Sequence, residues 1–288
     1  MFFKKRKTNY FILIIIFSGT IFIWSAIFSQ VPDSVLELHF FSVGQGDAIF
    51  IETPSHKQIL IDGGPDKSIL EKLNQVMPFW DREIDLMILT HPDADHVTGL
   101  IEVLKYFKIN HILFSGLDKE TAVYREWQEM IKQKGIPLSL AQTGQKIIFP
   151  DQVVLEIFWP DQRIISNYFE PTNNVSVVGQ LIYGASEILL TGDIEKKVET
   201  YLLTQNFNLE SDVLKIAHHG SKTSTSNNFL EAVNPQIAVI SVGENNRYQH
   251  PSQEILERLK NILVYRTDQL GDIEISTDGR LFRTRTEK

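Results

Sequence analysis

Residues 88–100, ILTHPDADHVTGL, place His91, Asp93, Asp95 and His96 directly after an apolar run. The apolar residues predict a buried strand that ends at Thr90, and the spacing of apolar residues from position 97 onward predicts a helix. Residues 91–96 then form a loop at the carboxyl end of a strand, where ligands commonly bind in folds that combine sheets with helices. The stretch therefore predicts a mixed α/β fold and, at one sheet edge, a ligand site.

The two imidazoles and two carboxylates of this loop favour a divalent metal. In a packed interior these groups would lose their hydration and the carboxylates would repel one another, unless cations offset the negative charge. A solvated acidic turn that caps the following helix is the alternative, because Asp is common before a helix. The presence of both histidines favours the metal site.

Three later strands also end in polar side chains. EILLTGD, residues 187–193, delivers Asp193 to a sheet edge, where one carboxylate can bridge two metals. DVLKIAHHGS, residues 212–221, ends at His218 and His219, which indicates one metal ligand and one proton donor or phosphate contact. QIAVISVG, residues 236–243, leads to His250, which is the weakest candidate because a simple turn residue explains it nearly as well.

The rest of the body alternates strand and helix patterns. Residues 36–43 and 48–53 predict a hairpin, and residues 83–90 a buried strand. Helices are expected over residues 68–77, 97–107 and 121–135, with closing strands near residues 262–266, 272–277 and 280–285. This mixture predicts sheets covered by helices in one main domain, residues 35–288.

Composition narrows the chemistry. A chain of 288 residues with 43% hydrophobic residues can bury a sizeable core. Its net charge of −8 argues against loose, charge-driven binding of nucleic acid, although a local basic groove stays open. Because the chain has no cysteine, disulfides and thiolate metal sites are excluded, and any metal must be held by His, Asp, Glu or Asn.

The N-terminal residues form a separate segment. Residues 1–8 are basic and are predicted to be cytoplasmic. The basic run is followed by an uncharged apolar stretch whose length is close to the ~20 residues needed to span a bilayer. Residues 9–30 are therefore predicted to be a transmembrane signal anchor. The charge distribution predicts a single-pass protein of the cell membrane whose catalytic domain is extracellular. A cleaved signal peptide and a buried core helix are the alternatives.

Several segments together resemble the metallo-hydrolase domain of the DNA-uptake (competence) protein family ComEC, a branch of the metallo-β-lactamase superfamily. In order, they are HFFSVGQGDAIFIE, ILIDGG, ILTHPDADHVTGL, NNVSVV, ILLTGD, LKIAHHGSKTS and YQHPS. HPDADH is similar to the His-x-His-x-Asp-His signature of that superfamily, with Asp93 at the position of the second histidine. The resemblance implies an αββα sandwich with metals at one edge.

The resemblance also implies roles for individual residues. His91 and Asp93 would hold one metal, Asp95, His96 and His219 the second, and Asp193 would bridge them. His218 would contact the substrate phosphate or protonate the leaving group, which with Asp95 makes it a candidate catalytic residue. Relatives often carry a further metal-binding histidine near the positions of Asn173 and Asn174. Without that histidine the site is rich in oxygen ligands, which suits manganese better than a histidine-rich site does. Two divalent ions, Zn or Mn, are expected. Groups expected to orient ligands or contact substrate are Asp47, Asp62, Asn174, Ser221 and His250.

A pair of metals acidifies a water to hydroxide, which attacks phosphorus while the cations stabilise the attacking and departing oxygens. We therefore expect a metal-dependent hydrolase of phosphoesters, with single-stranded DNA as the substrate that the resemblance favours. A DNA-uptake channel is a possible partner, although channel helices are absent from this sequence. The alternatives are a phosphodiesterase of small or surface-linked esters such as choline-phosphate groups, a non-catalytic DNA-holding module, and β-lactam or thioester hydrolysis, which Asp93 disfavours.

Basic and aromatic side chains outside these motifs are weaker candidates for DNA contacts. Lys215, Lys222, Arg247 and Arg266 are candidates for binding a phosphate chain, with solvated surface charge as the alternative. Aromatic side chains can stack on single-stranded bases. For Trp80, Tyr168 and Phe169, packing is the more ordinary role.

Overall fold

The computed structural model describes residues 2–28, 35–168 and 170–288, and the chain divides into two compact units, Met1–Ser34 and Val35–Lys288. The first unit contains the helix α1 (Phe2–Phe28). Among the described residues, no helix combines the length and apolar character needed to cross a bilayer. The expected transmembrane anchor over residues 9–30 is therefore not supported, and its last two residues lie outside the described part of the chain.

The second unit contains two large mixed sheets and a small two-stranded one. The first sheet has the order β17–β16–β1–β2–β3–β5–β7–β8 and the second the order β15–β14–β13–β12–β11–β10–β9. The strands of the first sheet are β1 (Leu36–Phe40), β2 (Ile49–Glu52), β3 (Gln58–Ile61), β5 (Leu86–Leu89), β7 (Ile112–Phe114), β8 (Leu138–Leu140), β16 (Ile273–Thr277) and β17 (Phe282–Thr286). Those of the second are β9 (Lys146–Ile148), β10 (Val154–Trp159), β11 (Val178–Tyr183), β12 (Ser186–Leu190), β13 (Val213–Lys215), β14 (Ile237–Ile240) and β15 (Leu263–Arg266), while β4 (Glu83–Ile84) pairs with β6 (Lys108–Ile109).

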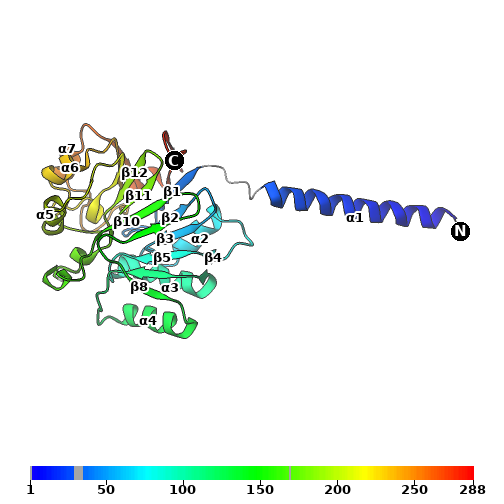
Figure 1. Ribbon diagram of the computed structural model, residues 1–288, viewed down its shortest axis with the longest axis horizontal. Coiled ribbons are helices and arrows are strands. Elements are labelled where there is room, and N and C mark those ends of the chain that lie inside the picture. The colour runs from blue at the N-terminus through cyan, green and yellow to red at the C-terminus, as the bar shows by residue number, and fades with distance from the viewer. Residues whose placement is uncertain (1, 29–34, 169) are drawn as a thin grey trace. The chain divides into compact units, whose positions relative to one another are not determined.

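Helices cover the outer faces of both sheets, so the second unit has four layers (Figure 1). One buried cluster joins α2 (Ser68–Val76), α3 (Ala94–Tyr106) and α4 (Ala122–Lys134) to the first sheet. Another joins α5 (Lys196–Thr204), α6 (Asn227–Val233) and α7 (Gln253–Arg258) to the second sheet. The short helices are α8 (Thr267–Leu270), η1 (Ile165–Tyr168), η2 (Thr172–Val175) and η3 (Ala217–Gly220).

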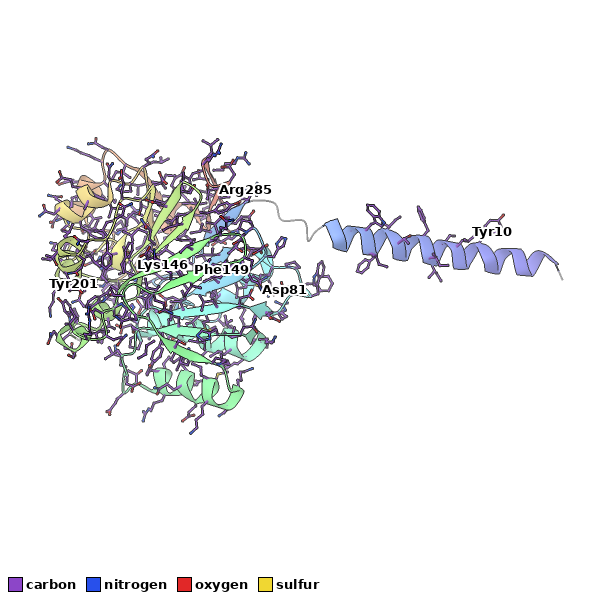
Figure 2. All side chains as sticks on the ribbon, viewed as in Figure 1. Tyr10, Asp81, Lys146, Phe149, Tyr201 and Arg285 are labelled. Atoms are coloured by element: carbon purple, nitrogen blue, oxygen red, sulfur yellow. The ribbon has the colours of Figure 1, made fainter. Side chains whose placement is uncertain are left out.

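The central core lies between the two sheets, where alternate side chains of both fill one apolar layer. Phe149, labelled in Figure 2 beside Lys146, belongs to this layer, whereas Tyr201 lies on the helical side of the second sheet. The mixed α/β fold and the αββα layering predicted from the sequence are confirmed. The predicted hairpin is confirmed as well, because β1 and β2 pair antiparallel with Leu38 opposite Ile51.

Three sequence expectations differ from the structure. The helix after the HPDADH stretch begins at Ala94 instead of residue 97. The strand expected over residues 83–90 is interrupted at Asp85, whose carboxylate accepts hydrogen bonds from Lys57 and from the Gln58 backbone. Strands β7 and β8 carry too few residues to give a recognisable alternation, and they were not foreseen.

Candidate metal centre

Parallel strands bring the polar loops of the two sheets to one edge. In the first sheet β3 and β5 run parallel, so that Asp62 and His91 follow neighbouring strand ends. In the second sheet β12 and β13 run parallel and lead to Asp193 and His219. Because the sheets pack face to face, four side chains from distant parts of the sequence meet, and all four are buried.

The start of α3 supplies two more side chains. Asp95 and His96 lie in its first turn, not on a loop as the sequence suggested. The turn is held against the loop after β3, since Gly63 N donates to His96 O at 2.8 Å and Gly99 N donates to Gly64 O at 3.0 Å. A Cβ at Gly99 would lie 1.8 Å from Gly63 O, so the glycine is required for this close approach.

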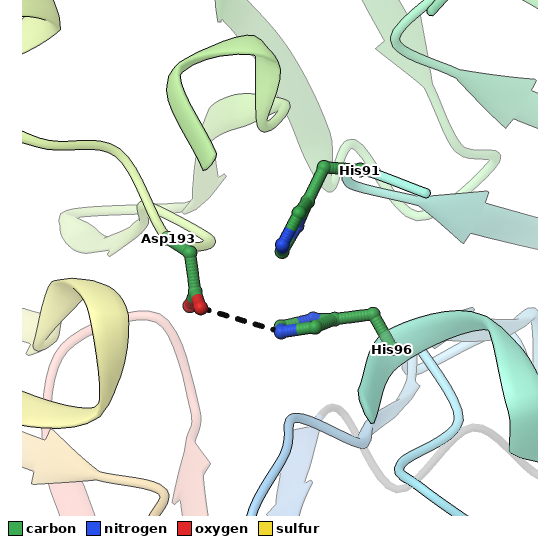
Figure 3. Close-up of side chains that lie close together, drawn as sticks. All are labelled: His91, His96 and Asp193. Carbon is green, nitrogen blue, oxygen red and sulfur yellow. Dashed lines mark ion pairs between the residues drawn. The ribbon is translucent and has the colours of Figure 1, made fainter. Parts of the chain in front are cut away.

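Asp193 is the meeting point of the histidines (Figure 3). Its Oδ2 atom lies 3.3 Å from His96 Nε2 and 3.3 Å from His219 Nε2, and His219 Nε2 lies 3.7 Å from Asp95 Oδ2. Four sets of ligand atoms, each within 4.8 Å of one another, overlap among the described residues. Two of them are His91, His96 and Asp193, and Asp95, His96 and His219. The other two contain Asp47, once with Asp62 and His96 and once with Asp193 and His219.

The unused nitrogens of these histidines fit a metal. His96 Nδ1 contacts Asp62 Oδ2 at 2.7 Å, and His219 Nδ1 contacts Ser241 O at 2.9 Å. In the neutral rings these acceptors place the proton on Nδ1, so that Nε2 is the nitrogen available to a metal, as in metal-ligating histidines. Both Nε2 atoms are buried without a hydrogen-bond partner. An unpartnered buried nitrogen is costly, so a divalent cation fits the residues present here.

The charges of the cluster oppose protonation at one histidine and favour it at two others. Burial and the neighbouring His96 lower the pKa of His91 to about 4, so that His91 is neutral near pH 7. Burial disfavours the charged forms of His96 and His219, but Asp193 and the other carboxylates around them raise both pKa values well above the ordinary range. In turn the histidines hold the pKa of Asp193 well below its ordinary value, against the effect of burial.

The backbone is strained at three residues of the centre. His218, His219 and Asp62 have φ values of 51°, 53° and 57°, in the left-handed region that residues other than glycine seldom adopt. Each costs free energy that surrounding contacts must offset, and such residues cluster at functional sites. The strained turn in η3 separates the two histidines, so that His219 is buried in the centre and His218 is half-buried at its edge.

Asp93 lies outside the sets of converging ligand atoms. It occupies the position before α3, but its side chain makes no capping hydrogen bond. Its Oδ1 instead accepts from Lys119 Nζ at 2.6 Å and from Thr172 Oγ1 at 2.8 Å. The structure thus gives no support to the helix-capping alternative at this residue, and the role of Asp93 as a ligand stays a prediction.

The other predicted residues surround the centre. Asp47 pairs with Lys215, and its Oδ1 lies 3.5 Å from His219 Nδ1. Asn174 Oδ1 accepts from Glu195 N at 3.0 Å, so it holds a loop instead of facing the ligand atoms. Ser221 Oγ contacts only Thr223, at 3.0 Å, among the hydrogen bonds of the described residues. The ring of His250 lies 5.8 Å from that of His218.

Two residues beside the centre, Ser176 and Thr90, were not predicted as site residues from the sequence. Ser176 Oγ accepts from Asp193 N at 3.1 Å and lies 3.2 Å from His91 Nδ1, so it joins the two ligand loops. Thr90 donates its backbone N–H and its hydroxyl to Asp62, at 2.8 and 2.6 Å. Serine and threonine are too common in such loops for the sequence to single them out.

The weaker DNA-contact candidates fall in different places. Lys215 is buried, so the prediction that it contacts a phosphate chain at the surface is wrong. Arg266 pairs with Asp268, whereas Lys222 and Arg247 are exposed. The ring of Tyr168 packs edge-on against Trp159. Trp80 is exposed beside Phe79, and Phe169 lies outside the described residues.

Comparison with known proteins identifies the family of this chain. The profile of the metallo-beta-lactamase superfamily matches residues 42–244. ComE operon protein 3 of Bacillus subtilis (strain 168) is 31% identical over 267 residues, which cover 85% of this chain and 33% of that protein. Competence protein ComA of Neisseria gonorrhoeae is 30% identical over 251 residues, with the same coverage of 85% and 33%. This chain therefore spans about a third of the length of these relatives.

A solved structure supports the fold alone. The metallo-beta-lactamase fold protein YhfI from Bacillus subtilis superposes with a TM-score of 0.52 at 11% identity, over 80% of this chain and 96% of that one. The resemblance to the ComEC family that the motifs indicated is confirmed by the two relatives. The chain belongs to the metallo-beta-lactamase superfamily and is a metal-dependent hydrolase related to the competence proteins of the ComEC family.

Proposed function

We propose that this protein hydrolyses phosphodiester bonds of DNA, with single-stranded DNA as its main substrate. The observation that carries the proposal is the convergence of Asp95, His96 and His219 on Asp193, with the ring of His91 4.1 Å from that of His96. Together these side chains offer enough ligand atoms for two cations, and two-metal sites are widely used to displace oxygen at phosphorus.

The residues divide between two ions. One ion would be held by Asp95, His96, His219 and Asp193. The other would be held by His91 and Asp193, and also by Asp93 if its carboxylate leaves Lys119. When bound, such ions lower the pKa of a water and stabilise negative charge on phosphoryl oxygens. The ion held by His91 and Asp193 would have few nitrogen ligands, because relatives often carry a further histidine near Asn173, and Asn173 contacts His218 in this chain. Oxygen ligands favour manganese, so we propose Mn or Zn as the native metals.

His218 is suited to move a proton at the edge of the centre. It is half-buried, its Nε2 lies 3.0 Å from Asn173 Nδ2, and its Nδ1 lies 3.5 Å from Glu195 Oε1. The carboxylate of Glu195 and the Asn173 amide hold the ring in place, and the partial exposure of His218 leaves it open to substrate. We assign His218 the donation of a proton to the departing oxygen.

The choice of DNA rests on the relatives, because one of them bears the name of a competence protein. We also propose a membrane-associated role beside a DNA-uptake channel, which cell fractionation and co-purification would test. Since this chain spans about a third of each relative, the activity of those larger proteins reaches it only as a proposal.

The test uses the full chain, stripped of metal and then supplied with manganese or zinc. Labelled single-stranded DNA and bis(p-nitrophenyl) phosphate are offered in parallel. We expect cleavage of DNA that falls at least 100-fold in Asp95→Ala and Asp193→Ala, while Asp151→Ala, remote from the centre, keeps full activity. Cleavage of the small diester alone would overturn DNA as substrate. Full activity in folded Asp95→Ala and Asp193→Ala variants would overturn the two-metal mechanism.

A further inference from the structure

Lys215 is a fully buried lysine beneath the metal centre. It is the last residue of β13, directly before the turn that carries His218 and His219, and its exposed fraction is 0%. Fully buried lysines are rare unless they are paired, because moving an ammonium out of water costs several kcal/mol. Its burial therefore requires an explanation from its contacts.

The ammonium lies among oxygen atoms from three loops. It forms an ion pair with Asp47 Oδ2, donates to Gly192 O at 3.1 Å, and lies 3.7 Å from Asp193 Oδ1. Asp193 Oδ1 is buried and has no hydrogen-bond partner, whereas Oδ2 of the same carboxylate faces His96 and His219. One oxygen of Asp193 thus faces the ligand atoms and the other faces Lys215.

The space on the inner side of Lys215 is apolar. A small cavity between the sheets is lined there by Ile49, Ile61, Leu155 and Leu190, with Asp47, Asp62 and Lys215 along its polar wall. In this surrounding the position of the ammonium is set by its contacts with Asp47, the Gly192 carbonyl and Asp193. In such low-dielectric surroundings a charge 3.7 Å away acts strongly on the carboxylate of Asp193.

We propose that Lys215 is a positioning residue for the metal centre: anchored by Asp47 and the Gly192 carbonyl, it holds Asp193 through Oδ1 and so keeps Oδ2 directed at the metals. The inference rests on the metal centre of the proposed function, and it extends that function by assigning the Lys215–Asp47 pair to metal affinity. A buried lysine in this place cannot contact a phosphate chain of the substrate.

The test is a metal titration of the double variant Lys215→Met/Asp47→Asn. Removing both charges avoids a lone buried charge, and replacement of a whole buried pair is often nearly neutral for stability. Net charge is unchanged, so the overall field does not account for a change in metal affinity. Because Asp47 belongs to two of the converging sets of ligand atoms, Lys215→Met, which keeps the Asp47 carboxylate, is measured beside the double variant. We expect the double variant to fold, with an affinity for manganese or zinc 10- to 100-fold lower, the range found when groups that orient ligands are removed.

Lys215→Met alone separates positioning from charge by sign. If the ammonium acted only through its charge, its removal would tighten cation binding, whereas loss of positioning weakens it. The matched control is Lys72→Met/Asp272→Asn, which removes a lysine–aspartate pair at 2.8 Å outside the centre and leaves metal affinity unchanged. Wild-type affinity in the folded double variant, or tighter binding in Lys215→Met, would overturn the proposal.

Metal affinity is measured by calorimetry without substrate. Failure of the protein to cleave DNA would therefore count against the proposed function and leave the result for Lys215 intact. Conversely, an active nuclease whose metal affinity is indifferent to the double substitution would refute the role of Lys215 alone.

Discussion

Asp62 determines which nitrogen of His96 faces the metals, and Asp62→Asn tests this role most directly. The carboxylate is fully buried and accepts three hydrogen bonds. Oδ1 accepts from Thr90 N at 2.8 Å, while Oδ2 accepts from Thr90 Oγ1 at 2.6 Å and lies 2.7 Å from His96 Nδ1. A carboxylate has acceptors only, so His96 must carry its proton on Nδ1 and present the Nε2 lone pair to a metal.

Asparagine keeps the size of the side chain but replaces one acceptor by a donor. If its carbonyl stays opposite Thr90 N, its amide group faces His96 Nδ1 at the 2.7 Å position. The ring must then accept at Nδ1 and move its proton to Nε2, the atom that would bind the metal. Asparagine tolerates the left-handed φ of 57° at this position, so the backbone should stay in place.

We expect metal affinity in Asp62→Asn to fall 10- to 100-fold, about 1.4–2.7 kcal/mol, with a parallel loss of activity at limiting metal. Calorimetric titration with manganese or zinc measures the affinity, and circular dichroism verifies the fold. Asp151→Asn is the matched control, because Asp151 also accepts hydrogen bonds, from Ser55, but is remote from the centre. A folded Asp62→Asn protein with wild-type metal affinity would refute the assignment of the His96 tautomer.

Two further predictions concern packing and protons. A change from glycine to alanine normally stabilises a helix interior by about 1 kcal/mol. At Gly99, however, the added Cβ would lie 1.8 Å from Gly63 O, so we expect Gly99→Ala to lower the free energy of unfolding in urea by about 2 kcal/mol or more. Unchanged or higher stability would contradict the close approach. The raised pKa values of His96 and His219 stabilise the metal-free fold below about pH 6.5, and this contribution is lost as pH rises through the folded-state pKa. Because a metal must displace these protons, we expect the affinity for the metal to rise from pH 6.5 to 8. Calorimetry in buffers of different ionisation enthalpy measures both the affinity and the protons released. Equal metal affinity at the two pH values would count against protonated histidines.

Local sequence patterns were sufficient for most of the fold. The apolar runs before His91 and Asp193 become buried strands with these residues at their ends, because strand formation and burial follow from short-range periodicity. The start of α3 was placed three residues late, since ligand side chains interrupt the apolar spacing there without interrupting the helix. Short strands such as β7 carry too little periodicity to be recognised.

The sequence predicted that His91, Asp193 and His219 follow strand ends, and the order of its motifs implied that they form one centre with Asp95 and His96. It did so because strand ends are local features, and because the order of the motifs marks the superfamily. The structure brings these side chains together, and their roles as metal ligands stay a prediction.

The contacts that support the centre follow from the packing of the two sheets. The tertiary structure turned Asp93 toward Lys119, placed Asp62 behind His96, and buried Lys215 between Asp47 and Asp193. Each of these contacts joins residues far apart in the chain, and their distances depend on how the two sheets pack against each other. No local pattern records that packing, so the same lysine that looked like a surface contact in the sequence became a buried charge in the fold.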